Sequence, residues 1–201
     1  MLNRCKTLVM LSVLFLVSAA QASLVDLNNF YADPTVIVSV DGSTATIGES
    51  AIISPVLLSN DPFLGDPEVI FAEIAGTGQR LTFDYDFVEP AGNDDEFGAF
   101  VINVTTGLSA GPSFEFFTQS TSSGTVSFDL SSLAGNQLGL QFELSALPGD
   151  PGLTSTVEIS NVSLTPIPVP GAALLGAAGL VASSLMNRGW RRRDITAKSP
   201  A

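Results

Sequence analysis

Strict alternation of apolar and polar side chains in several short segments constrains the fold of this chain more than any other feature. The segment 81–88 reads LTFDYDFV, so every second residue from Leu81 to Phe87 is apolar and the residues between them are polar. Successive side chains of a β-strand point to opposite faces, so this pattern predicts a strand with one buried and one exposed face. The segments 125–130 and 137–144 alternate in the same way. Strands of this kind are typical of antiparallel sheets.

Further short runs of Val, Ile, Phe and Thr are bounded by Gly, Pro, Asn, Asp and Ser, which mark turns. They predict additional strands within 35–40, 44–48, 51–58, 69–75, 97–104 and 154–164. In the segment 97–104 we expect the inward residues to be Phe100, Ile102 and Val104. A total of about eight or nine short strands, with no long helical period between the termini, predicts an all-β fold, an antiparallel two-sheet sandwich.

Two segments predict local features of this sandwich, a β-bulge and an edge strand. In 154–164 the apolar parity shifts after Ile159, which predicts a β-bulge near Ser160 and Asn161. Pro55 has no N–H to give to a neighbouring strand, so we expect its strand at the edge of a sheet.

The charge of the central region excludes one class of partner. Between residues 23 and 168 there are nineteen acidic residues and a single basic one, Arg80, a formal charge of 1 − 19 = −18. Such a surface repels phosphate groups. We therefore expect no binding to nucleic acid.

The first 22 residues have the features of a secretory signal peptide. A basic start with Arg4 and Lys6 precedes an apolar run and the small residues around Ala22, which predicts cleavage between Ala22 and Ser23. The only cysteine, Cys5, lies in this segment, and the chain has no histidine. The exported chain then lacks a disulfide, a thiol nucleophile and a Ser-His-Asp triad.

The C-terminal region predicts a membrane anchor. A proline-containing segment at 166–170 is followed by an uncharged run rich in Gly, Ala and Leu, which predicts a transmembrane helix at 171–187. The positive residues that follow predict a cytoplasmic end and an outer location for the acidic domain. These stop residues are Arg188, Arg191, Arg192 and Arg193. The domains are thus the signal peptide 1–22, the acidic β-sandwich 23–165, the C-terminal signal 166–193 and a tail at 194–201.

The order of the central strands is similar to that of a known domain type. The segments LTFDYDF, NDDEFGAFVIN, SGTVSFDLSSLAGNQLGLQFEL and STVEISNVSL together resemble the jelly-roll domain of secreted bacterial surface proteins, which is itself similar to carbohydrate-binding modules. The resemblance covers roughly residues 70–164. It implies a jelly-roll-like arrangement of the two sheets.

The C-terminal signal resembles the PEP-CTERM sorting signal of Gram-negative bacteria. In the sequence Ile167-Pro168-Val169-Pro170 both prolines match the usual Val-Pro-Glu-Pro, whereas Val169 replaces the glutamate. The resemblance implies export by the Sec machinery across the inner membrane, and transient anchoring there. An exosortase, a membrane cysteine protease-transpeptidase, would then process the chain near Pro168, Val169 and Pro170. It also implies a final location at the cell surface or outside the cell, alongside exopolysaccharide.

Our main functional hypothesis is a structural or interaction protein of the cell surface or biofilm matrix, without catalytic activity. The alternative is a β-sandwich that binds calcium or polysaccharide. Its candidate calcium ligands are carboxylates of one strand face and of the loop before the next strand, since calcium prefers hard oxygen ligands. They are Asp84, Asp86, Asp94 and Asp95. A solvated acidic face would explain the same residues.

Two further observations bear on sugars. Trp190, the only tryptophan, lies in the predicted cytoplasmic region, and among the phenylalanines Phe117 breaks the alternation of its segment. One exposed ring could therefore be present there, although phenylalanine is more often a core residue. A remote alternative is a glycosidase that pairs Asp84 with Glu96 or Glu143 as acid and base.

Overall fold

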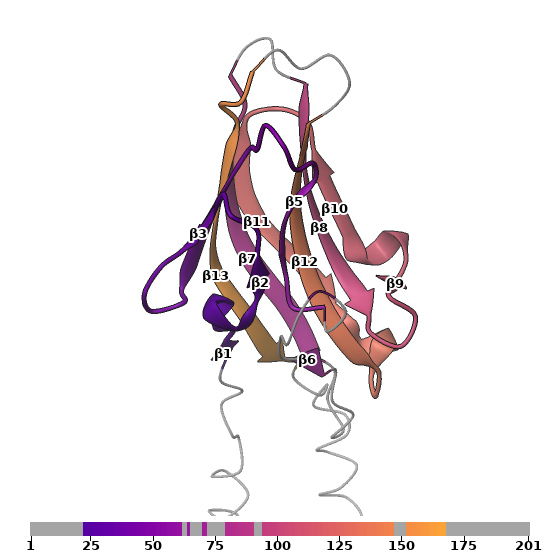
Figure 1. Ribbon diagram of the computed structural model, residues 1–201. Coiled ribbons are helices and arrows are strands. Elements are labelled where there is room, and N and C mark those ends of the chain that lie inside the picture. Colours follow the sequence, from indigo (N-terminus) through magenta and orange to yellow (C-terminus); the bar gives the residue numbers. More distant parts are fainter. Residues whose placement is uncertain are drawn as a thin grey trace, which may run out of the picture. The chain divides into compact units, whose positions relative to one another are not determined.

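The computed structural model describes residues 22–61, 64, 70–71, 79–90, 94–146 and 152–167, which form an all-β fold (Figure 1). Ala22 and Ser23 are the first described residues. Residues 1–21, the processing motif at 168–170, the predicted span at 171–187 and the four stop arginines lie outside the described residues. Within the described part, no helix has the length and apolar character to cross a membrane.

The first of two antiparallel sheets, here called sheet A, has the strand order β11-β7-β13-β4-β3, and β1 pairs with β13. Its strands are β1 (Ser23–Leu24), β3 (Val36–Val38), β4 (Thr44–Gly48), β7 (Gln79–Val88), β11 (Ser122–Asp129) and β13 (Thr156–Pro166).

The second sheet, sheet B, has the order β10-β8-β12-β5-β2, with β6 paired to β12 and β9 to β8. Its strands are β2 (Tyr31–Ala32), β5 (Val56–Ser59), β6 (Ile70–Phe71), β8 (Asp95–Asn103), β9 (Leu108–Ser109), β10 (Glu115–Thr118) and β12 (Gln137–Ala146). The described residues also include the short 3-10 helices η1 (Leu27–Asn29), η3 (Pro112–Phe114) and η4 (Leu130–Leu133).

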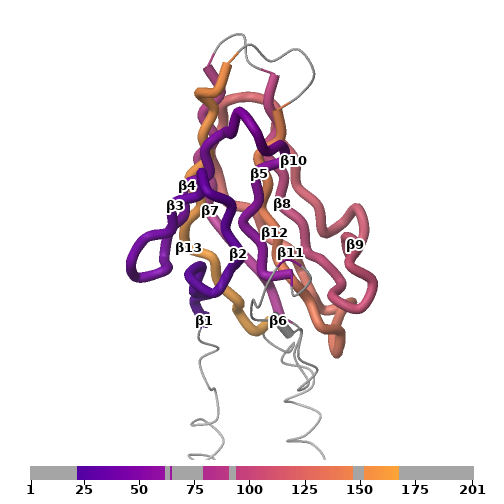
Figure 2. Tube along the Cα trace, in the orientation of Figure 1, coloured from indigo at the N-terminus to yellow at the C-terminus, as the bar shows by residue number. Residues whose placement is uncertain are grey.

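The two sheets face each other, and the predicted antiparallel sandwich is confirmed (Figure 1). From β10 onward the chain alternates between the sheets, because β10 and β12 belong to sheet B whereas β11 and β13 belong to sheet A (Figure 2). Buried apolar residues of both sheets form one core cluster.

The core between the sheets is built around phenylalanine rings. Phe83 of β7 and Phe142 of β12 are fully buried, and their ring centroids lie 5.0 Å apart at 82°. Phe97 of β8 is fully buried as well, and its ring centroid lies 6.5 Å from that of Phe142. Such offset and edge contacts between buried rings add to the stabilisation from burial itself. The predicted inward faces of β7, β11 and β12 are confirmed by this core.

The predicted bulge is present in β13. The pairing of β13 with β7 shifts register between Ser160 and Ser163, and Asn161 has a positive φ of 53°. The edge position predicted from Pro55 is wrong. The strand β5 begins at Val56, one residue later, and pairs with β12 on one side and β2 on the other. Pro55 therefore precedes the strand and withholds no ladder hydrogen bond.

The predicted orientation of β8 is also wrong. Its inward residues include Phe97, Ala99 and Val101, which belong to the core, whereas Phe100 is half-buried on the outer face. Ile102 and Val104 are buried without joining the core cluster. The segment carries apolar residues at both parities, so alternation could not select the face, and a shift by one residue exchanges the two faces entirely.

The first and last described strands meet at one end of the sandwich. Ser23 of β1 lies opposite Leu164 of β13, and the Val25 N–H donates to the Val162 carbonyl at 2.9 Å. In Figure 1 both β1 and the C-terminal end of β13 lie at the bottom of the sandwich.

Candidate functional site

Asp84 and Asp86 lie on β7 in sheet A, with side chains opposite in direction to the core residues Phe83 and Phe87. One oxygen of Asp84 accepts a hydrogen bond from Thr125 Oγ1, and the other accepts from Asn161 Nδ2 at 2.7 Å. The hydrogen bonds from Thr125 and then Asn161 hold the pKa of Asp84 below its ordinary value. Asp84 thus links β11, β7 and the bulge of β13.

Asp95 begins β8 in the other sheet, and Asp94 immediately precedes that strand. Asp94 is exposed, whereas Asp95 is fully buried, on the same side of the strand as Phe97. Neither carboxylate oxygen of Asp95 has a hydrogen-bond partner among the described residues, although its N–H donates to Glu89 Oε1 at 3.2 Å.

The four proposed calcium ligands are therefore separated. Asp84 and Asp86 face outward from sheet A, and Asp95 is enclosed on the inner side of sheet B. In the part of the chain that the structure describes, no group of three His, Cys, Asp or Glu residues is arranged to hold a metal ion. The structure does not bring these residues together as one site.

The acid–base pairs considered for a glycosidase are separated too. Glu96 and Glu143 belong to the outer face of sheet B, whereas Asp84 belongs to the outer face of sheet A. Asp84 cannot act with either glutamate on one bond. Glu96 and Glu143 do share a face, because Glu143 lies opposite Gly98 and Glu96 lies two residues before that glycine.

The outer face of sheet B also carries an aromatic pair. Phe117 of β10 is 46% exposed. Its ring centroid lies 5.1 Å from that of Phe100 on β8, and the two ring planes are at 77° to each other. Phe117 lies opposite Gly98, and Gly98 lies opposite Glu143 on β12. One row of the sheet therefore joins an exposed ring, a glycine and a carboxylate across three strands.

Gly98 allows these groups to come close. A Cβ at this position would lie 2.8 Å from Phe100 Cε2 and 3.1 Å from Glu143 Cγ. Without that atom, there is room for both the ring of Phe100 and the stem of Glu143 over the backbone of Gly98. A glycine inside a strand often marks such a close approach.

Two amides hold the carboxylates of this face. Gln141 Nε2 donates to Glu143 Oε2 at 3.1 Å, and Gln119 Nε2, just after β10, donates to Glu96 Oε2 at 2.6 Å. Burial raises the pKa of Glu143, the hydrogen bond from Gln141 opposes this, and the charge of Glu96 raises the pKa further. The face therefore combines aromatic surface with hydrogen-bonding groups that are already oriented.

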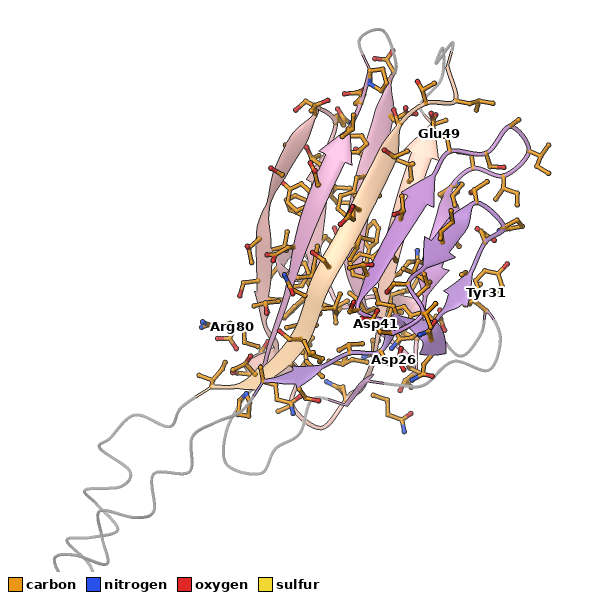
Figure 3. The ribbon with its side chains drawn as sticks, turned by 90° about the vertical axis from the view of Figure 1, so that its left-hand side faces the viewer. Asp26, Tyr31, Asp41, Glu49 and Arg80 are labelled. Atoms are coloured by element: carbon orange, nitrogen blue, oxygen red, sulfur yellow. The ribbon has the colours of Figure 1, made fainter. Side chains whose placement is uncertain are left out.

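We call this set the sheet B patch. It consists of Glu96, Phe100, Glu115, Phe117, Gln119, Gln141 and Glu143. Its carboxylates have no cationic neighbour on the same face, because the only Lys or Arg in the described residues is Arg80, which projects from β7 in sheet A (Figure 3).

Sequence reasoning found only part of this patch. It named Glu96 and Glu143 in another pairing and noticed that Phe117 breaks the alternation, but expected Phe100 to face the core. Gly98, inside the strand-forming segment 97–104, was the feature of the sequence that could have predicted a close approach of side chains on that face.

No protein-family model matches the sequence, and no curated protein matches it either. Several solved structures are similar in shape. The tandem CBM22-1-CBM22-2 domain of Paenibacillus barcinonensis Xyn10C matches 77% of this chain at 14% identity, with a TM-score of 0.41. This chain spans about half of that structure, 52%.

Two other similar structures differ in their described role. The family 11 carbohydrate-binding module of Clostridium thermocellum Lic26A-Cel5E matches 75% of this chain and 97% of its own length, at 11% identity and a TM-score of 0.38. The enzymatically active domain of tailspike protein 4 of bacteriophage CBA120 matches 75% of this chain and 20% of its own, at 10% identity and a TM-score of 0.41. These TM-scores are all below 0.5, and the binding and enzymatic roles named here are those of the similar proteins.

Proposed function

We propose that the sandwich is a non-catalytic polysaccharide-binding domain and that the sheet B patch contacts the sugar. The observation that carries the proposal is the exposed ring of Phe117 in contact with Phe100, beside Glu143 and Gln141. The C–H faces of a sugar ring pack on aromatic rings, and its hydroxyl groups both donate to carboxylates and accept from amides. The sheet B patch offers all three kinds of partner.

Binding across an open sheet face suits a polymer better than a small molecule. The patch spans β10, β8 and β12, which are neighbours in sheet B. Several sugar units of one chain could contact such a surface together, and weak contacts then add up. The role is proposed as binding alone because Glu96 and Glu143 are each held by a glutamine amide rather than by a group that could relay a proton.

The test is binding of the purified protein to a panel of insoluble and soluble polysaccharides, by pull-down and affinity electrophoresis. We expect at least one glycan to bind and Phe117→Ala to weaken it about tenfold or more, because the exposed ring supplies stacking area. Ile37→Ala is the matched control, since Ile37 is 71% exposed on β3 of sheet A. No binding by the unaltered protein, or an equal loss in both variants, would refute the assignment.

We further propose that this domain is the cargo of an exported protein sorted by an exosortase to the cell surface or biofilm matrix of a Gram-negative bacterium. The signal-like start, the prolines at 168 and 170, the apolar run and the arginine cluster support this. Replacing Pro168 and Pro170 together with alanine should leave the protein at the inner membrane, because the prolines keep the processed segment extended. Surface delivery at the normal level in fractionated cells would reject the proposal.

A further inference from the structure

The sheet B patch is acidic as well as aromatic. Glu115 lies opposite Phe100, Glu143 lies opposite Gly98, and Glu96 lies on the same strand as Phe100. Three carboxylates thus surround one ring pair, with no Lys or Arg on that face among the described residues. A ligand bound between them would be placed in a field of negative charge.

The carboxylates also affect each other. Glu143 is half-buried, and burial together with the charge of Glu96 raises its pKa. The hydrogen bond from Gln141 opposes both effects, but among the described residues no Lys or Arg on this face balances the negative charge of Glu143. A cation placed beside Glu143 and Glu96 would relieve the desolvation and the mutual repulsion together.

The ring pair favours the same kind of ligand. An ammonium group near the face of an aromatic ring is attracted by the negative charge of that face. Phe117 leaves nearly half of its surface open, and the ring of Phe100 lies close to Glu143 above Gly98. A positive group beside these rings would contact aromatic faces and carboxylates at once.

We infer that the polymer bound by the sheet B patch is an amino-sugar polysaccharide with free amino groups, whose ammonium groups pair with Glu96 and Glu143 beside Phe100 and Phe117. This inference rests on the proposed function of the patch. It excludes uronate-rich and sulfated glycans, since their charge has the same sign as the patch. Neutral glycans can still bind through stacking and hydrogen bonds, but more weakly.

Three oligosaccharides of equal length test the inference, because they share a β-1,4-linked glucose backbone and differ only at carbon 2. Chitosan oligomers carry an amine there, chitin oligomers an N-acetyl group and cello-oligomers a hydroxyl. In calorimetric titrations at a pH that keeps the amine protonated, we expect the amine form to bind at least tenfold more tightly than the other two. The advantage should shrink as salt is added, because salt screens exposed charges.

Isosteric variants separate the patch from the general acidity of the domain. Glu143→Gln and Glu96→Gln should each weaken the binding of the amine form several-fold more than the binding of the hydroxyl form. Glu158→Gln is the matched control, because it removes the same charge from the exposed face of β13 in sheet A. It should leave all three affinities unchanged.

The outcomes distinguish the two proposals. Equal affinity for the three oligomers, with continued dependence on Phe117, would overturn the amino-sugar inference and keep the polysaccharide-binding function. A loss with Glu158→Gln as large as with Glu143→Gln would also overturn it, because the attraction would then be a general effect of negative charge. Failure of all three oligomers and of the polysaccharide panel would overturn both.

Discussion

Asp95 is the residue whose environment is most unusual for its chemistry. It is fully buried, and neither carboxylate oxygen has a partner in the described part of the chain. A buried polar group without a hydrogen bond costs about 1–3 kcal/mol, and more when it is charged. We expect Asp95→Val to increase the free energy of unfolding by about 1–3 kcal/mol, as measured by urea denaturation. Valine is also well suited to a β-strand.

The neighbouring residue provides the control. Asp94 is exposed, so Asp94→Val should change stability by less than about 0.5 kcal/mol. Repeating both series with added calcium tests the original calcium hypothesis. If calcium stabilised the protein and Asp95→Val abolished that stabilisation, the Asp95 carboxylate would be a cation ligand. The expected increase in the free energy of unfolding for Asp95→Val would then be wrong.

Asp84 makes stability depend on pH. Its pKa is lowered in the folded protein by the hydrogen bonds from Thr125 and Asn161, so the folded state binds a proton less readily than the unfolded state. The contribution of the Asp84 carboxylate to the free energy of unfolding is complete above the ordinary Asp pKa of about 4. This contribution disappears as the pH falls through the lower pKa of Asp84 in the folded protein. The melting temperature should therefore differ between the unaltered protein and Asp84→Asn at neutral pH, and this difference should shrink below about pH 4.

Asp86→Asn is the comparison for that series, since Asp86 lies on the same outward face of β7. It removes one negative charge without removing the link to Thr125 and Asn161. A difference for Asp84→Asn that stays constant from neutral to acidic pH would show that the carboxylate does not act through its ionised form.

At the scale of elements, the glycine in β8 sets the geometry of the sheet B patch. In Gly98→Ala the new Cβ would lie within 3.1 Å of both Phe100 and Glu143, so the ring and the carboxylate must move apart. We expect glycan binding to fall about tenfold or more while the fold is retained, as shown by an unchanged far-ultraviolet circular dichroism spectrum.

Gly48→Ala is the matched substitution for this comparison. Gly48 ends β4 in sheet A, and a Cβ there would meet only the Thr35 carbonyl at 3.7 Å, an ordinary contact. Its affinity for glycan should equal that of the unaltered protein. Unimpaired binding by Gly98→Ala would mean that the closeness of Phe100 and Glu143 is irrelevant to the ligand.

Alternation predicted the strands well where only one parity is apolar. In β7 and β12 each core residue is separated from the next by a polar residue or glycine, and the predicted inward faces are correct, with Tyr85 only partly buried. In β8 apolar residues occupy both parities, so the pattern contained no information about which of Phe97 and Phe100 faces inward. Local sequence cannot resolve that choice.

The sheet B patch was harder to predict because it depends on register between strands far apart in the chain. Phe117, Gly98 and Glu143 become neighbours only when β10, β8 and β12 pair in one particular alignment. The core of the two sheets fixes that alignment, since a shift by one residue would bury the polar side chains of β12. The bulge at Asn161, by contrast, was visible as a change of parity within one segment.

At the scale of the whole molecule, the expected processing at both termini is open to direct measurement. We expect mass spectrometry of protein recovered from the cell surface to find a mature chain that begins at Ser23 and ends between Pro168 and Gly171. The C-terminal cut should be absent from cells that lack the membrane transpeptidase. A chain intact through Ala201 in both strains would indicate an ordinary membrane anchor and contradict the sorting proposal.

The pairing of β1 with β13 determines how the domain would respond to mechanical load. Ser23 and Leu164 are direct neighbours, so a pull on either strand end reaches the sandwich at the same end. A force that separates the two strand ends would open the contact between β1 and β13 one hydrogen bond after another. The last residues of β13, Thr165 and Pro166, are held by β7 alone, so the pairing of β13 with β7 would bear the load on that strand end from the start.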